Sequence, residues 1–214
     1  MRKKNRITNG IWADYTTMAV RTGGPGAGGL SLLVVPLKNQ AGVTMRPIPV
    51  MGMATTGTTF IELDDVRVPV ENLVGVEGAG MKYVMTNFNH ERLTIALGVV
   101  RQARVALSTA FEYVLKREAF GQSLVQQPVV RHRLARAGAE LEPLSAWLEQ
   151  FLYMMTHLPK QDADRELGGL TAMAKAKAGM VLGECAQCAV LLFGGNGLTR
   201  TGQGELVEST NTMT

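Results

Sequence analysis

The spacing of the apolar residues changes at Gly80, and this change restricts the chain to folds in which a helical half follows a strand half. From residue 80 to 118, apolar side chains recur every three or four positions and no proline interrupts them. This spacing predicts one long helix. At about 3.6 residues per turn, the helix would have about ten turns.

Two further helices are expected after the first. A proline suits the first position of a helix over about 128–157, and Pro143 inside it predicts a kink. After a polar turn, an alanine-rich helix is expected to run to Phe193, with Asp162 or Asp164 as its N-cap. Three long helices joined by short turns predict an antiparallel bundle.

The residues before the long helix predict strands. Short runs rich in β-branched and apolar residues are separated by Gly and Pro: YTTMAVRT, LSLLVVPL, VTMRPIPV, TTFIELDDV and RVPVENLVG. We expect an antiparallel meander that forms a small sheet or barrel. The predicted class is therefore α+β, with a partial β-domain over 1–74 and an incomplete helical-bundle domain over 75–214. The final residues, GELVESTNTMT, would form only a truncated fourth helix.

The loop between the first two strands contains Gly24, Gly26 and Gly29, which match the glycine pattern of nucleotide-binding loops. In those loops the glycines open a helix whose N-terminal amides bind phosphate. Here LSLLVVPL follows, which has no helical period. We therefore interpret the segment as a hairpin loop.

The composition excludes several functional classes. Lys and Arg are spread along the chain, so its net charge of +4 does not indicate a nucleic-acid partner. Cys185 and Cys188 lie at helical spacing and the three histidines are scattered, so we expect two small core residues and no metal site. We also expect no membrane span, because no uninterrupted apolar stretch is long enough to cross a bilayer.

Glu91 is an unexpected charge in the long helix. Val84, Phe88, Ile95 and Gly98 share its helical face. If this face is buried, the pKa of the carboxyl group should be raised, which suits a general base. The glycine would leave space for a substrate. A structural ion pair with a nearby arginine is the alternative, and spacing alone favours that alternative.

The arginines near this helix also have two interpretations each. Arg92 either extends to the surface or a local carboxylate, or it binds a phosphate. Arg117 stands where the helix ends, and a cation is favourable there because of the helix dipole alone. The spacing of the residues does not decide between these interpretations.

Six motifs in order give the chain a resemblance to a known family. They are ITNGIWADY with AVRTG and LLVVP, TTFIELDDVRVPVENLVG, EGAGMKYVMTNFNHERL, EYVLKREAFGQSL, RHRLA and LFGGNG. With these motifs the chain resembles the flavin-dependent acyl-CoA dehydrogenases over nearly its whole length. The resemblance implies the later part of a middle β-domain followed by most of a four-helix bundle.

The chemistry implied by the resemblance is α,β-desaturation of an acyl-CoA thioester. A carboxylate takes the α-proton, and the β-hydrogen leaves as hydride to FAD. His90-Glu91-Arg92-Leu93 matches the members, such as the isovaleryl- and long-chain-type enzymes, whose base lies on the first bundle helix. Glu91 is then the catalytic base, Arg92 helps to hold the substrate, and Asn89 lies near the CoA moiety.

The resemblance also assigns contacts with the flavin. Thr8 matches a threonine beside the isoalloxazine ring. Arg117 and Phe120 match residues that reach the FAD of a neighbouring subunit, with the arginine on the pyrophosphate. Gly194 and Gly195 match glycines that approach the far end of the cofactor. A homo-oligomer (dimer or tetramer) and an electron-transfer partner are implied.

The chain departs from the family pattern at several positions. Arg6 stands where a tryptophan usually covers the flavin, while Pro128 and Leu191 replace frequent glutamines. A non-catalytic truncated fragment or helical scaffold is one alternative function. An acyl-CoA oxidase, which shares the fold, is the other. Family members occur in the cytoplasm and in mitochondria, and this sequence does not choose between them.

Overall fold

A computed structural model describes residues 2–50 and 54–211. Two compact units divide the chain, residues 1–87 and residues 88–214. The first unit contains the strands up to residue 74, and the second contains the helical bundle. The helix α1 (Gly80–Lys116) begins in the first unit and continues through the second. The predicted boundary at residue 74 falls where the last strand of the first unit ends, six residues before α1 begins.

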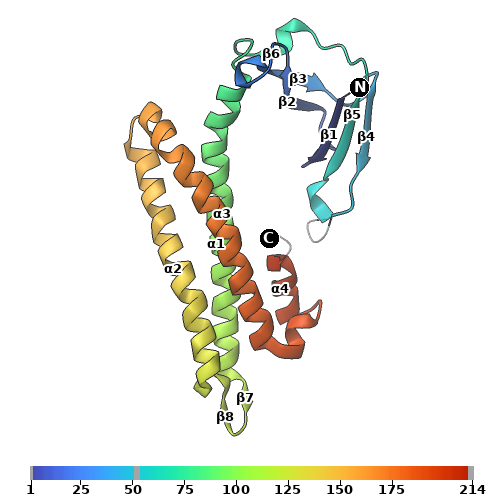
Figure 1. Ribbon diagram of the computed structural model, residues 1–214. Coiled ribbons are helices and arrows are strands. Elements are labelled where there is room, and N and C mark those ends of the chain that lie inside the picture. The colour runs from blue at the N-terminus through green and yellow to red at the C-terminus, as the bar shows by residue number, and fades with distance from the viewer. Residues whose placement is uncertain (1, 51–53, 212–214) are drawn as a thin grey trace. The chain divides into compact units, whose positions relative to one another are not determined.

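Six strands and three short 3-10 helices form most of the first unit (Figure 1). In chain order they are β1 (Arg2–Ile7), β2 (Tyr15–Arg21), η1 (Ala27–Gly29), β3 (Leu30–Pro36), β4 (Val43–Pro47), η2 (Ala54–Thr56), β5 (Thr59–Leu63), η3 (Val70–Asn72) and β6 (Leu73–Val74). Two three-stranded antiparallel sheets result, with strand orders β1-β5-β4 and β2-β3-β6. Their shared core includes Met18, Val35 and Ile61.

The strand predictions are mostly confirmed, but the predicted meander is wrong. β1 pairs with β5, which lies far along the chain, and β4 pairs on the other side of β5. The glycine-rich segment is the loop of the β2–β3 hairpin, as predicted. The run RVPVENLVG forms only η3 and the two-residue β6, because Pro69 lacks the amide that a ladder requires.

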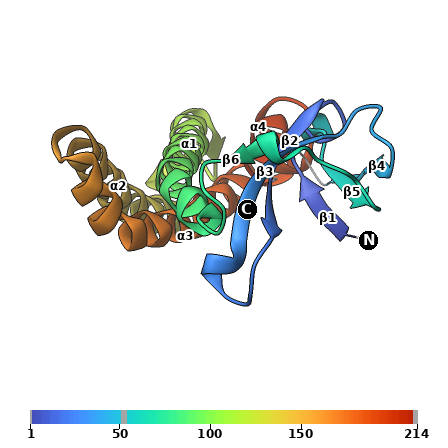
Figure 2. The same cartoon turned by 90° about the horizontal axis from the view of Figure 1, so that it is seen from above.

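Three long helices and a short fourth helix form the second unit (Figures 1 and 2). They are α1 (Gly80–Lys116), α2 (Pro128–His157), α3 (Lys160–Phe193) and α4 (Gln203–Asn211), with a hairpin of β7 (Glu118–Ala119) and β8 (Gln122–Ser123), η4 (Leu124–Gln126) and η5 (Gly194–Leu198) between them. The antiparallel order of the long helices confirms the predicted bundle. Proline starts α2 and Pro143 lies inside it, as expected.

Small residues let the helices pack closely. Ala96, Ala103 and Ala110 are spaced seven residues apart on α1 and are fully buried. They belong to one apolar core together with α2 and α3 residues such as Leu148 and Leu182. The predicted N-cap of α3 is wrong: the helix begins at Lys160 after Pro159, and no side chain caps it. Proline fixes its own φ angle and so starts the helix two residues before Asp162.

Candidate functional site

Glu91 lies on an open face of α1. Its side chain is exposed, and so are Phe88 and Ile95, one turn away on either side, with exposed fractions of 42% and 46%. A Cβ atom added at Gly98 would meet no other atom within 4 Å. The condition of a buried face is therefore not met, because the apolar neighbours of Glu91 form a surface and not part of the core.

The alternative ion pair for Glu91 is also absent. Among the residues whose side chains the structure describes (6–50 and 55–207), no Lys or Arg nitrogen lies within 4.0 Å of its carboxylate. Glu91 is thus an unpaired carboxylate on an apolar surface, about two helical turns from Gly98. A ligand with an apolar portion can approach this carboxylate without displacing a side chain.

The two neighbouring site residues differ in environment. Arg92 stacks over the ring of Phe88, with 5.3 Å between its Cζ atom and the ring centroid. Asn89 is buried, with 4% of its surface exposed, and its Nδ2 donates a hydrogen bond of 3.2 Å to the carbonyl oxygen of Asp164. Arg92 is consequently positioned at the edge of the Glu91 face, whereas Asn89 joins α1 to α3.

Thr8 lies in a tightly constrained turn of the first unit. Its side chain is exposed. The amide of Asn9 donates to the carbonyl of Thr56 at 2.7 Å, and Asn9 has a φ of 61°. A Cβ atom at Gly10 would lie 2.8 Å from the Cβ of Thr59, so only glycine fits there. These contacts fix the backbone of the turn in which the exposed Thr8 side chain lies.

At the other end of α1, Arg117 directly follows the helix, and Phe120 lies in the turn of the β7–β8 hairpin. Phe120 has a φ of 57° and Gly121 a φ of 76°, which is the conformation of a two-residue type I′ turn. The Phe120 ring is 93% exposed. Arg117 is exposed and lines a cavity of about 330 Å³ together with Tyr113 and Gln203.

Gly194 and Gly195 begin η5, and this turn is attached to the end of α1. Neither glycine has an atom within 4 Å of an added Cβ. Just beside them, Asn196 donates a hydrogen bond to the Tyr113 hydroxyl at 3.3 Å, and the Tyr113 ring packs edge-on against Phe193. Tyr113 therefore links the glycine turn to the cavity that Arg117 lines. No sequence motif had indicated this role for Tyr113.

The predicted site residues of the second unit thus form two separate groups. From Glu91 to Arg117, the helical rise of about 1.5 Å per residue amounts to about 39 Å. Asn89, Glu91 and Arg92 form one group, and Arg117 and Phe120 form the other with the glycine turn. The structure does not bring the two groups together within one bundle.

The residues predicted to contact FAD are each open to a ligand at their own place in the fold. Arg117 has no ion pair with any described residue, so its guanidinium is available to an anion. No side chain blocks the backbone at Gly194 and Gly195. Thr8 offers a hydroxyl and Phe120 an aromatic ring. Each residue predicted to contact FAD is therefore accessible for that contact.

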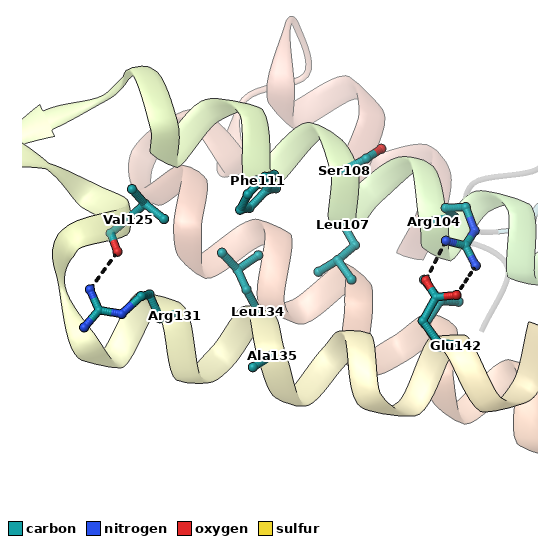
Figure 3. A pocket seen from close by; sticks show the side chains of 10 residues that line it. Arg104, Leu107, Ser108, Phe111, Val125, Arg131, Leu134, Ala135 and Glu142 are labelled. Carbon is teal, nitrogen blue, oxygen red and sulfur yellow. Dashed lines mark hydrogen bonds and ion pairs between the residues drawn. The ribbon is translucent and has the colours of Figure 1, made fainter.

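Another cavity, of about 480 Å³, lies between α1 and α2 and contains none of the predicted residues (Figure 3). Leu107, Phe111 and Leu134 form its apolar wall. An ion pair between Arg104 and Glu142 lies at one end. The pair raises the pKa of Arg104 and lowers that of Glu142, in both cases chiefly through their hydrogen bonds.

Two observations on the described residues concern metal binding and thiol reactivity. The part of the chain that the structure describes has no group of three or more His, Cys, Asp or Glu residues that could hold a metal ion. Cys185 and Cys188 are free and buried, as expected. Burial is the main cause that raises the pKa of both thiols, that of Cys185 to about 12.

One stretch, Lys160–Leu198, is long and apolar enough to span a membrane when judged by length and composition alone. Charged residues such as Lys177 and Glu184 interrupt this stretch, so it is not the uninterrupted apolar segment that the sequence was expected to lack. Half of its most apolar window is buried inside the fold. The core helix of a bundle meets the same criterion, because its buried face is apolar.

Family models match both halves of the chain. The model for the acyl-CoA dehydrogenase middle domain matches residues 2–66, and the model for the acyl-CoA dehydrogenase C-terminal domain matches residues 78–211. The two matches follow the order of the strand half and the helical half.

Individual proteins give the same result. The chain is 73% identical over 206 residues to the acyl-CoA dehydrogenase apdG of Emericella nidulans, covering 96% of this chain and 47% of that protein. It is 39% identical to the acyl-CoA dehydrogenase AFT10-1 of Alternaria alternata, covering 96% and 48%. The crystal structure of a probable acyl-CoA dehydrogenase from Mycobacterium abscessus has a TM-score of 0.86 and 34% identity, covering 99% of this chain and 55% of that one. The chain spans about half the length of these proteins.

Proposed function

Because the chain belongs to the acyl-CoA dehydrogenase family, we propose that it acts in the FAD-dependent α,β-desaturation of an acyl-CoA thioester. Glu91 takes the α-proton of the acyl group. FAD, when bound, supplies the acceptor for the β-hydride. The product is the α,β-unsaturated thioester.

The observation that carries this proposal is the unpaired carboxylate of Glu91 on the open apolar face of α1. An ion-paired glutamate would hold its lone pairs in hydrogen bonds and would make a poor base. The apolar surfaces of Phe88 and Ile95 offer contact to an acyl chain. About two helical turns from the base, the missing side chain at Gly98 leaves room for the more distant part of that chain.

Arg92 and Asn89 support the substrate in different ways in this proposal. Arg92 follows Glu91 directly in the sequence, and its guanidinium stacks on Phe88. In this position the guanidinium would pair with an anionic part of a CoA whose acyl group lies at Glu91. Asn89 holds this end of α1 against α3 through its bond to Asp164. Because this bond occupies the side-chain amide, a contact of Asn89 with the CoA would come from its backbone or from its side chain in another rotamer.

The FAD contacts are proposed for Thr8, Arg117, Phe120, Gly194 and Gly195. The separation of about 39 Å between Glu91 and Arg117 supports an oligomer. A flavin beside Glu91 lies too far from Arg117 of the same bundle, so Arg117 and Phe120 would contact the cofactor of a second copy. An electron-transfer partner would reoxidise the flavin.

The test is the reaction of the FAD-loaded protein with acyl-CoA thioesters of increasing chain length under anaerobic conditions. We expect bleaching of the flavin absorbance by at least one thioester. Glu91→Gln should abolish the bleaching and leave FAD bound, because the amide cannot accept the α-proton. Glu149→Gln, an exposed carboxylate on α2, is the matched control and should bleach normally. Bleaching by Glu91→Gln at the wild-type rate would exclude Glu91 as the base.

A further inference from the structure

The strand β1 contains an irregularity immediately before Thr8. Lys4 pairs with Ile61 of β5, but the next pair joins Ile7 to Thr59. Between these two pairs the register moves three residues along β1 but only two along β5, so β1 contains one extra residue. Such a bulge changes the direction in which a strand presents its side chains, and bulges are frequent beside functional sites.

Arg6 lies in this bulge and has a φ of 59°. Glycine commonly occupies this left-handed conformation, and asparagine tolerates it, whereas a long side chain does so at an energetic cost. Backbone strain of this kind persists where the surrounding structure enforces it, and it is concentrated at functional sites. The strain at Arg6 therefore needs an explanation beyond local sequence preference.

The Arg6 side chain is exposed and has no ion-pair partner among the residues that the structure describes. Its Cα atom is two residues from that of Thr8, which limits their separation to about 7 Å. A group that touches the exposed Thr8 hydroxyl is thus within reach of the long Arg6 side chain.

We propose that Arg6 is an electrostatic tuning residue for the flavin, holding a positive charge beside the ring that Thr8 contacts. This inference rests on the proposed function. Hydride transfer brings two electrons and one proton to the neutral oxidised ring, which becomes a singly negative anion. A nearby guanidinium stabilises that anion more than the neutral ring, and charge close to the flavin ring tunes its chemistry. Arg6 therefore raises the reduction potential.

The experiment is a reductive titration of the FAD-loaded protein with dithionite and a reference dye. Arg6→Asn removes the charge but accepts the left-handed backbone, so the fold should be retained. We expect the affinity for reduced flavin, relative to oxidised flavin, to fall about tenfold or more. For a two-electron couple this corresponds to a midpoint potential lower by about 30 mV or more.

Two further variants complete the test. Arg6→Lys keeps the charge and should retain most of the wild-type potential. Arg67→Asn removes another exposed arginine from the same unit and should leave the potential unchanged. Equal potentials for wild type and Arg6→Asn, with FAD bound in both, would overturn this inference alone. The inference would also be overturned if Arg6→Asn and Arg67→Asn shifted the midpoint potential of the flavin by the same amount. A wild-type protein that binds no FAD would overturn the proposed function and this inference with it.

Discussion

Arg104 on α1 and Glu142 on α2 form a two-point hydrogen-bonded ion pair, with nitrogen–oxygen distances of 2.6 and 3.0 Å (Figure 3). Arg104 also donates to the hydroxyl of Ser145 at 2.9 Å. The parallel alignment of both guanidinium nitrogens with both carboxylate oxygens is the strongest geometry for such a pair. This contact joins the first two helices of the bundle at the end of the apolar cavity.

The stabilisation from this pair should depend on pH in the acid range. Hydrogen bonding to Arg104 lowers the pKa of Glu142 from its ordinary value of 4.5. A lowered pKa in the folded state adds stability above the unfolded value, and this stability is lost as the pH falls through the folded value. Urea unfolding should therefore show wild type more stable than Glu142→Gln at pH 7, with the difference shrinking below pH 4.5. A difference that is constant with pH would show that charge is not the cause.

The two cysteines should be unreactive in the folded protein. Both are buried in α3 and their thiols have raised pKa values, that of Cys185 reaching about 12. The thiolate is the reactive form, so a disulfide reagent at pH 8 should label neither thiol in native protein and both after unfolding in guanidinium chloride. Rapid labelling of the native protein would show that α3 opens locally.

Asn89 should contribute to stability through its buried amide. Asn89→Ala removes the hydrogen bond to the Asp164 carbonyl and should lower the free energy of unfolding by about 1 kcal/mol. Asn87→Ala, two residues earlier on α1 and exposed, is the control and should change it little. The comparison is made by denaturant unfolding. If the two variants are equally stable, the Asn89 amide is free to serve a ligand without a structural cost.

Phe120 should destabilise the fold but contribute to FAD retention or self-association. Its left-handed backbone costs about 1–2 kcal/mol, and its 93% exposed ring gains little from packing. Phe120→Gly should therefore raise the melting temperature of the flavin-free protein. The same variant should weaken FAD retention or self-association, measured by flavin absorbance and sedimentation. A variant that is more stable and keeps both properties would show that the ring has no partner.

The helices were predictable because their signals are local. Apolar periodicity and the proline that starts α2 are properties of neighbouring residues, and the predicted ends of α1 and α2 lie within a few residues of the observed ones. The pairing of β1 with β5 was not predictable in this way. Strand partners are chosen by sheet assembly across the whole unit, and the apolar pattern of a strand does not name its partner.

The environment of Glu91 was not predictable for a related reason. Apolar residues at positions 88 and 95 are as compatible with an exposed apolar surface as with a buried core. Periodicity reports that a face is apolar, and it does not report what covers that face. The contact of Asn89 with Asp164 and the link from Tyr113 to Asn196 likewise join distant residues, so no motif indicated them.

The central claim is that Glu91 abstracts the α-proton of an acyl-CoA. It is tested most directly by proton exchange in D₂O with phenylacetyl-CoA, which has α-protons but no β-hydrogen and so permits proton abstraction without hydride transfer. Mass spectrometry should detect deuterium at the α-carbon with wild-type holoprotein, and Glu91→Gln should exchange at least about a hundredfold more slowly. Exchange by Glu91→Gln at the wild-type rate would contradict the claim.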